Sequence, residues 1–382
     1  MTNSDAPIIG ILGDGQLALM LGESARSQGV NFLAFGENIN SSFANSFPDN
    51  FILGNLHNHS EVIAFAKLCS VITLENEFLP SELLKIIESE TGTLVIPDSS
   101  SYQNFESKIS QREFFQSLKI PSPKWAIGKL DFPYSFVLKA NRGGYDGYGV
   151  RIVNNAQQLD QALLDLKHTS ENPVLVEEKV SIAREFAQGA LFDGKGGMVM
   201  LPLVETIQRN GICELVLSKS TLAQPEFESV KSKIESILFE ISKCKIKGLF
   251  NFEFFYTTQG DVLINEGAPR PHNSQHLSLN ASIVSQFDLL ISFLAKGLLP
   301  KLDSPILAIP GVMINLLGKV NGLSYDFSLP TLPQGIEAFP KLYGKKESRI
   351  GRKMGHLNVI DQSGSHDLLK LGERLLIWSK KP

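Results

Sequence analysis

The sequence lacks the features of a membrane, fibrous or disulfide-rich protein. Its richest apolar stretch, Leu289 to Leu299, is interrupted by a lysine and a glycine and is shorter than the ~20 apolar residues that span a bilayer. Only three cysteines occur in 382 residues, Cys69, Cys213 and Cys244. They are odd in number and form no C-x-x-C pair, which predicts reduced thiols rather than a disulfide framework.

An excess of charge of one sign is also missing. The 36 Lys and Arg against 40 Asp and Glu leave a net charge of −4, so the chain has no basic field that would favour nucleic acid as a partner. The first five residues contain no basic region, and we therefore expect no signal peptide, no membrane partner and a cytoplasmic location. A 43% hydrophobic content with 24 Phe is instead typical of a folded enzyme.

The length predicts two or three domains, and the first begins with a βαβ rhythm. Strands are expected at Ile8–Leu12, Asn31–Phe35 and Val71–Leu74, with a helix over Leu17–Ser27. This alternation is typical of a parallel sheet covered by helices. The polar cluster Pro97–Ser101 predicts the first domain boundary.

The remaining chain changes character. A helix is expected over Glu106–Leu118, a hairpin over Leu249–Tyr256 and Asp261–Ile264, and a further helix over Ser282–Leu298. Repeated prolines beyond residue 299 predict small strands and no long helix. We therefore predict an α/β protein, α+β overall, with a Rossmann-like N-terminal domain at 1–100, a central domain at 101–299 and a small β-rich C-terminal domain at 300–382.

A glycine loop follows the first expected strand. Gly13, Gly15 and Ala18, with Glu37 near the end of the next strand, fit the dinucleotide fingerprint, in which the acidic residue lies about 20 residues on. A nicotinamide-dependent oxidoreductase is therefore one alternative. A tight turn without a ligand is another, because Asp14 would repel a pyrophosphate.

A second glycine-rich segment, Lys139–Gly149, has four glycines in seven residues flanked by Lys139 and Arg142. Such a segment can fold over a polyphosphate while the two cations balance its charge. It lacks the Gly-Lys-Ser/Thr of a P-loop. The nearby run Val174–Val180 ends in two carboxylates and a lysine, which alone indicates only a solvated strand end.

The expected hairpin carries paired carboxylates. Strand periodicity places Asn251 and Glu253 on one face. If Tyr256 pairs with Asp261, Glu266 lies opposite Asn251 and diagonal to Glu253. Two carboxylates between aromatic residues favour a Mg²⁺ ion carried in with phosphates over an accidental solvated pair.

Two basic segments follow. Arg270 and His272 lie in the proline-stiffened run Gly267–Ser274, where they could clamp phosphate or bicarbonate. The run Tyr343–His356 has six basic side chains in fourteen residues. It is either a solvated face or a loop that receives a substrate phosphate.

With these motifs the chain resembles the ATP-grasp superfamily and, within it, the family of 5-(carboxyamino)imidazole ribonucleotide synthases of purine biosynthesis. The resemblance covers nearly the whole length. The residues that carry it are Gly15-Gln16-Leu17, Thr73–Glu77, Arg142–Gly147, Asn265-Glu266, Ala268–Ser274 and Gly351–His356.

The resemblance implies an ADP-forming ligase that uses ATP and bicarbonate to carboxylate 5-aminoimidazole ribonucleotide. Carboxyphosphate would be the intermediate, 5-carboxyaminoimidazole ribonucleotide, ADP and phosphate the products, and Mg²⁺, as two ions, the cofactor. A homodimer is also implied. Alternatives are a formate-dependent phosphoribosylglycinamide formyltransferase-like enzyme, whose flap would not be expected to read Gly-Gly-Tyr-Asp-Gly, and a non-catalytic nucleotide sensor.

The same resemblance implies roles for individual residues. Mg²⁺ would be held by Glu253 and Glu266, and the catalytic residues would be Arg270, His272, Asp146 and Lys353. ATP would be bound by Lys108, Lys139, Glu177, Glu178, Lys179, Val180, Glu185, Asn265 and Glu266. The imidazole ribonucleotide would be bound by Gln16, Glu77, Tyr145, Asp146, Asn273, Lys345, Arg352 and Lys353.

Four positions depart from the family pattern. Lys108 stands where the family commonly has arginine, which replaces a bidentate phosphate contact by a point charge. Asp14 replaces a loop glycine, Tyr148 a frequently basic residue and Gln275 a frequent glycine. None of them removes a carboxylate of the expected metal pair.

Overall fold

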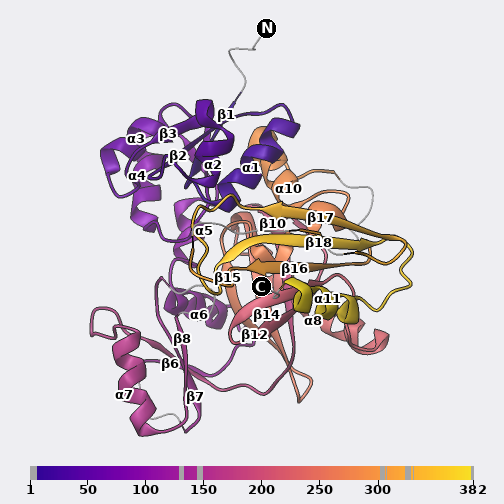
Figure 1. Ribbon diagram of the computed structural model, residues 1–382. Coiled ribbons are helices and arrows are strands. Elements are labelled where there is room, and N and C mark those ends of the chain that lie inside the picture. Colours follow the sequence, from indigo (N-terminus) through magenta and orange to yellow (C-terminus); the bar gives the residue numbers. More distant parts are fainter. Residues whose placement is uncertain are drawn as a thin grey trace.

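The computed structural model describes residues 7–128, 133–143, 149–301, 306, 308–322, 328–329 and 331–379. Its ribbon divides into an N-terminal α/β unit, a small projecting lobe with helix α7, and a large antiparallel sheet (Figure 1). Among the described residues, no helix combines the length and the apolar character needed to cross a bilayer.

The N-terminal unit is a five-stranded parallel sheet in the order β3-β2-β1-β4-β5. Its strands are β1 (Ile8–Leu12), β2 (Asn31–Gly36), β3 (Phe51–Leu53), β4 (Val71–Leu74) and β5 (Leu94–Val95). Its helices are α1 (Gln16–Ser27), α2 (Ser42–Ser46), η1 (Pro48–Asn50), α3 (His59–Ala66), α4 (Ser81–Thr91) and α5 (Ser99–Gln103). Apolar residues bury both faces of the sheet, as the continuous apolar strands predict.

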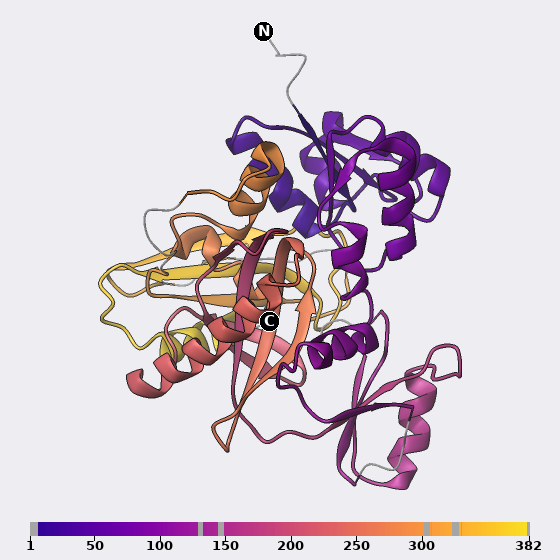
Figure 2. The same ribbon diagram turned by 180° about the vertical axis from the view of Figure 1, so that it is seen from behind.

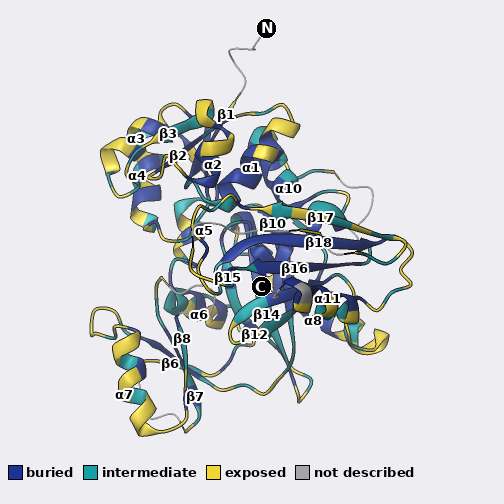
Figure 3. Ribbon diagram, in the orientation of Figure 1, coloured by how far each residue is buried: buried dark blue, intermediate teal, exposed yellow. Residues whose placement is uncertain are grey.

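The small lobe is a four-stranded antiparallel sheet, β6-β9-β7-β8, covered by one helix. Its elements are β6 (Trp125–Ile127), β7 (Phe136–Lys139), β8 (Val150–Val153), α7 (Ala156–Asp165) and β9 (Leu175–Glu178). Helix α6 (Lys108–Ser117) leads into this lobe. The outward side of α7 is exposed, whereas the strands of the large sheet are mostly buried (Figure 3).

The large sheet has nine strands in the order β15-β14-β10-β12-β13-β16-β18-β17, with β11 paired to β10. Its first strands are β10 (Ile182–Asp193), β11 (Met198–Met200), β12 (Val204–Arg209), β13 (Ile212–Leu217), β14 (Lys247–Thr257) and β15 (Val262–Ala268). The C-terminal strands β16 (Gly311–Leu317), β17 (Ile336–Leu342) and β18 (Lys353–Asp361) continue the same sheet.

Helices cover the large sheet and connect it to the N-terminal unit. They are α8 (Gln224–Ser242), η2 (Asn273–Gln275), α9 (Ser278–Ala281), α10 (Gln286–Lys296) and α11 (Leu368–Ser379). Helix α10 packs beside α1, where the Ser24 hydroxyl donates to Asp288 at 2.6 Å. Seen from behind, α10 bridges the two units (Figure 2).

The predicted fold class is confirmed, and most element bounds differ by few residues. Strands Ile8–Leu12 and Val71–Leu74 have the predicted ends. The predicted helix at 282–298 begins later, because Ser285 forms a capping box with Asp288. The prediction of no long helix after residue 299 is wrong: α11 places an apolar face against β16 and β13.

Candidate active site

A cavity of about 320 Å³ lies where the three parts of the chain meet. Its walls include Glu77 of the N-terminal unit, Lys108 of α6, Glu253 and Glu266 of the large sheet, and Arg270 and His272 just beyond it. Six of the predicted site residues therefore share one concave site, the usual setting for a small-molecule ligand.

The carboxylate pair is formed by a β-bulge. Strand β14 pairs Phe254 with Ile264, yet Glu253 pairs with Glu266, so Asn265 is an extra residue on β15. The predicted register is wrong, because Tyr256 pairs with Val262 and Asn251 pairs with Ala268. The two carboxylates do share a face, as predicted, but they lie directly opposite one another.

The environment treats these carboxyl groups differently. Burial and the neighbouring carboxylates Glu266 and Glu185 raise the pKa of Glu253. Burial would also raise the pKa of Glu266, but Lys108 and Lys139 outweigh it and lower that pKa. Lys108 makes a direct ion pair with Glu266. Glu253 therefore holds a proton more readily than Glu266 does, and a metal that binds at Glu253 would displace that proton.

The donor set suits Mg²⁺ bound together with phosphate. Among the residues described, no group of three or more His, Cys, Asp or Glu could hold a metal by itself. Glu253 and Glu266 offer hard oxygen donors, and Mg²⁺ commonly uses one or two carboxylates with the remaining positions filled by water and substrate phosphates. The residues present therefore fit a metal that arrives with ATP.

A buried network lies behind this pair. The Lys139 ammonium is 2.7 Å from Glu177 and donates to the Asn265 side-chain oxygen at 2.8 Å. Arg112 also pairs with Glu177, at 2.5 Å, and donates to the Asn265 carbonyl oxygen at 2.6 Å. The sequence analysis missed Arg112, although it lies four residues after Lys108 and so shares its helix face.

Glu185 lies on β10, beside the carboxylate pair. Burial raises its pKa to about 7, with Lys139 lowering it and Glu266 raising it. Its predicted contact with ATP stays a prediction. Near pH 7 this group is poised between its two protonation states.

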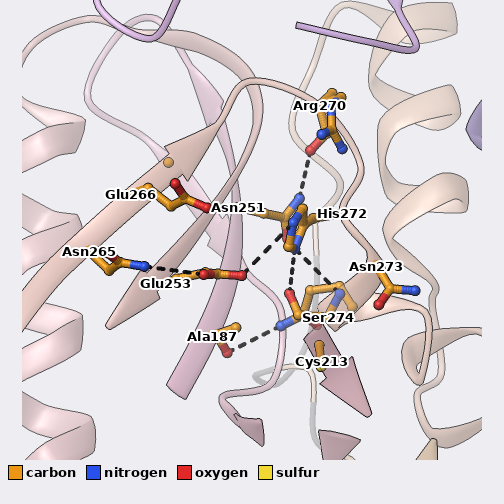
Figure 4. Close-up of polar contacts among 12 residues, drawn as sticks. Ala187, Cys213, Asn251, Glu253, Asn265, Glu266, Arg270, His272, Asn273 and Ser274 are labelled. Atoms are coloured by element: carbon orange, nitrogen blue, oxygen red, sulfur yellow. Dashed lines mark hydrogen bonds and ion pairs between the residues drawn. The ribbon is translucent and has the colours of Figure 1, made fainter. Parts of the chain in front are cut away.

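Arg270 and His272 also line the cavity, and Figure 4 shows them beside the carboxylate pair. Arg270 pairs with Glu77, and its carbonyl oxygen accepts from Asn251 at 2.8 Å. The His272 ring hydrogen-bonds Ser274 at 2.9 Å and points toward Glu253, 3.9 Å away. Burial, Arg270 and Lys353 lower the pKa of His272 to about 4, so the ring is neutral near pH 7.

The basic run is divided by the fold. Lys345 donates to the Lys353 carbonyl oxygen at 2.8 Å, and Arg352 donates to the Glu347 carbonyl oxygen at 2.9 Å. Lys353 is buried and its charge affects the pKa of both His272 and Glu253. His356 does not belong to a basic surface, because burial lowers its pKa to about 3.

Asn273, a predicted substrate ligand, is buried in a reciprocal amide pair. It donates to Asn315 at 2.9 Å and accepts from it at 2.7 Å. Asn315 also donates to the Cys213 carbonyl oxygen at 2.9 Å. Since that carbonyl oxygen can only accept, it fixes the orientation of both amides.

The glycine loop holds a carboxylate of the protein. Added Cβ atoms at Gly13 and Gly15 would lie 2.7 and 2.3 Å from side-chain oxygens of Glu75. Burial raises the Glu75 pKa, and the Leu17 backbone amide in the first turn of α1 counters it. Glu37 accepts from the Leu56 amide at 3.0 Å. An acidic side chain thus lies against the loop where the oxidoreductase alternative requires a pyrophosphate.

The remaining predicted residues that the structure describes are not among those that line the cavity. Glu178 ends β9 and accepts from the Lys124 amide at 2.9 Å, and exposed Lys179 and half-buried Val180 connect β9 to β10. Gln16 begins α1. The flap residues Tyr145 and Asp146, with the departure Tyr148, lie outside the described residues.

Three family models match successive parts of the chain. A ribonucleotide synthetase preATP-grasp domain matches residues 7–104, an ATP-grasp domain matches residues 107–287, and a phosphoribosylaminoimidazole carboxylase C-terminal domain matches residues 311–368. The first model matches the N-terminal unit, the second spans the small lobe and strands β10–β15 of the large sheet, and the third matches strands β16–β18 of the same sheet.

Individual proteins match over nearly the full length. N5-carboxyaminoimidazole ribonucleotide synthase of Synechococcus elongatus is 31% identical, covering 92% of this chain and 89% of its own. The crystal structure of N5-carboxyaminoimidazole ribonucleotide synthetase from Thermotoga maritima is 28% identical with a TM-score of 0.77, covering 98% of both chains. A synthase from Aspergillus clavatus, in complex with ADP and 5-aminoimidazole ribonucleotide, shares the fold at a TM-score of 0.82 and 23% identity, covering 98% of this chain and 99% of its own. This chain, with its paired carboxylates and cationic walls, therefore belongs to the N5-carboxyaminoimidazole ribonucleotide synthase family of ATP-grasp ligases.

Proposed function

We propose that the chain carboxylates 5-aminoimidazole ribonucleotide with ATP and bicarbonate, as a step of purine biosynthesis. The observation that carries this proposal is the position of Glu253 and Glu266, which face each other in the cavity that also contains Lys108, Arg270 and His272. This cavity combines carboxylates for a metal with cations for phosphates. Such a combination suits phosphoryl transfer followed by capture of an acyl phosphate.

In the first step a bicarbonate oxygen attacks the γ-phosphorus of ATP, and the bond from that phosphorus to the bridging oxygen of ADP breaks. The products are carboxyphosphate and ADP. Lys108 and Lys139 neutralise phosphate charge from one side, and Glu253 and Glu266 would hold Mg²⁺. When bound, Mg²⁺ supplies charge neutralisation for the phosphate oxygens. The protein's contribution is mainly positioning.

In the second step the exocyclic amine of the ribonucleotide attacks the carboxyl carbon. The bond from that carbon to the phosphate oxygen breaks, phosphate leaves and the amine nitrogen loses a proton. Arg270, held by Glu77, offers a planar cation for bicarbonate and carboxyphosphate. His272 is neutral near pH 7 because of its lowered pKa, so it contributes a hydrogen bond rather than a charge.

The ribonucleotide is assigned to the side of the cavity that is nearest the N-terminal unit and β18. Lys345, Arg352 and Lys353 would contact its phosphate, with Gln16, Glu77 and Asn273 contributing polar contacts. Tyr145 and Asp146 are assigned to the same substrate by the family resemblance. Two Mg²⁺ ions, a homodimer and a cytoplasmic location are likewise proposals drawn from the family.

The decisive experiment measures release of ADP and phosphate from Mg-ATP, with aminoimidazole ribonucleotide and bicarbonate each supplied or omitted. We expect release to require the ribonucleotide, and labelled bicarbonate to enter an acid-labile product. Release that instead requires formate and phosphoribosylglycinamide would identify the formyltransferase alternative. ATP binding without release in any combination would contradict the proposal and favour a nucleotide sensor.

A further inference from the structure

The extra residue Asn265 decides which face of the sheet Glu266 occupies. In a regular ladder that continues from the pair Phe254–Ile264, Glu253 would face Asn265, and Glu266 would face Phe252. Side chains alternate along a strand, so Glu266 would then point to the opposite face from Glu253. The bulge is therefore the reason why the two carboxylates meet.

The bulged residue is held on two sides. Its carbonyl oxygen accepts from the Arg112 guanidinium at 2.6 Å, and its side-chain oxygen accepts from Lys139 at 2.8 Å. Arg112 comes from α6 and Lys139 from β7, and both pair with Glu177 of β9. Arg112 and Glu177 are each only 2% exposed. The buried ionic cluster of Arg112, Lys139 and Glu177 is thus hydrogen-bonded to the bulge of the large sheet.

We propose that Arg112 is a positioning residue for the metal carboxylates: by holding the Asn265 carbonyl oxygen, it stabilises the bulge that places Glu266 opposite Glu253. Arginine suits this task because its planar group presents several donors at once. Here Nε donates to Glu177 at 2.6 Å, while Nη2 reaches both Glu177 and Asn265. A lysine ammonium group in its place could keep the charge but could not make the hydrogen bonds to Glu177 and to the Asn265 carbonyl oxygen in the same geometry.

This inference rests on the proposed function, because it concerns the Mg²⁺ that accompanies ATP. The test uses Arg112→Lys, which retains the charge beside Glu177, and measures binding of Mn²⁺ in the presence of ADP by the paramagnetic resonance of free Mn²⁺. We expect metal affinity to fall by about ten- to a hundredfold, the usual effect of changing a residue behind a metal ligand. ADP binding without metal, measured by calorimetry, should stay at the wild-type value.

A second variant addresses folding. Arg112→Met leaves Glu177 paired with Lys139, so the buried carboxylate keeps a cationic partner, and it should weaken Mn²⁺ binding similarly. Ile234→Val is the matched control: Ile234 is buried in the core behind Phe252 and Ile264, and trimming it perturbs packing without touching the bulge.

The outcomes separate the two proposals. If the wild-type chain fails to bind Mn²⁺ with ADP, the proposed function is wrong. If the wild type binds and folded Arg112 variants bind equally well, the positioning role is wrong. Equal weakening in Ile234→Val would show that general destabilisation, rather than the bulge, is responsible. In steady-state assays the Mg²⁺ requirement should rise in Arg112→Lys, while KM for the ribonucleotide stays unchanged.

Discussion

Replacing Glu266 by Gln should abolish most turnover while leaving the protein folded. The change keeps the size of the side chain but removes one carboxylate from the pair with Glu253 and the partner of Lys108. Loss of one preorganised electrostatic contact to a transition state costs about 10²- to 10³-fold in kcat, or about 3 to 4 kcal/mol of barrier. We expect at least that loss here.

The folding free energy should change far less. The Glu266 side chain is 34% exposed, so the lost ion pair with Lys108 is worth only about 1 kcal/mol. Against this, neutralising Glu266 removes the repulsion that helps to raise the pKa of Glu253, which is a stabilising change. The two effects have opposite signs, and the net shift in stability should be close to zero.

The assay pairs phosphate release under saturating substrates with urea denaturation of the nucleotide-free protein. Glu228→Gln is the control, since Glu228 is an exposed carboxylate of α8 that contacts Gln224. Turnover within tenfold of wild type would refute the metal assignment. A large fall in the urea midpoint would instead show that the loss of activity comes from unfolding.

Three further results are expected. Lys353→Ala should raise KM for the ribonucleotide more than KM for ATP; an effect confined to ATP in steady-state kinetics would reverse the assignment of that segment. Asn315→Leu removes both hydrogen bonds between the Asn273 amide and Asn315. A buried polar group left unpaired costs about 1 to 3 kcal/mol, which urea denaturation should show as a lower free energy of unfolding. The substitution should also raise KM for the ribonucleotide, and an unchanged KM would contradict the assignment of Asn273 to the substrate site. The pKa of His356 is about 3 in the folded protein and 6.5 ordinarily, so below pH 6.5 the unfolded chain binds a proton that the native chain does not, and the free energy of unfolding falls by about 1.4 kcal/mol per pH unit. In His356→Gln this free energy should fall less steeply between pH 6.5 and 4.5. An identical slope would contradict the low pKa.

The sequence was sufficient for the features that depend on local patterns. Alternating apolar strands and helices predicted the N-terminal sheet, and the positions of Glu253, Glu266, Arg270 and His272 predicted residues that do line one cavity. These predictions succeeded because strand periodicity and segment spacing are local properties.

The features that were missed depend on distant parts of the chain. The predicted register was already wrong at the turn, where Tyr256 pairs with Val262 and not with Asp261. The bulge then shifts the pairing by one more residue, and it leaves no mark in the spacing of Glu253 and Glu266. In the sequence Arg112 resembles any solvated helix residue, because its buried partner Glu177 lies 65 positions later in the chain. Helix α11 was missed because the expectation of no long helix, which came from the frequent prolines before residue 334, was applied also to the following region, where prolines are few.

The large sheet also constrains how the chain can be divided. Strand β13 is bordered on one side by β12 and on the other by β16, in the pairs Leu215–Ile314 to Leu217–Val312. A protein ending at residue 299 would leave β13 as an open edge, with unpaired amides and carbonyl oxygens beside the apolar residues Leu215 and Leu217. Such edges recruit strands from other molecules. The C-terminal segment therefore protects the sheet from self-association, and a truncated chain should be prone to aggregate even though it keeps Glu253, Glu266, Arg270 and His272.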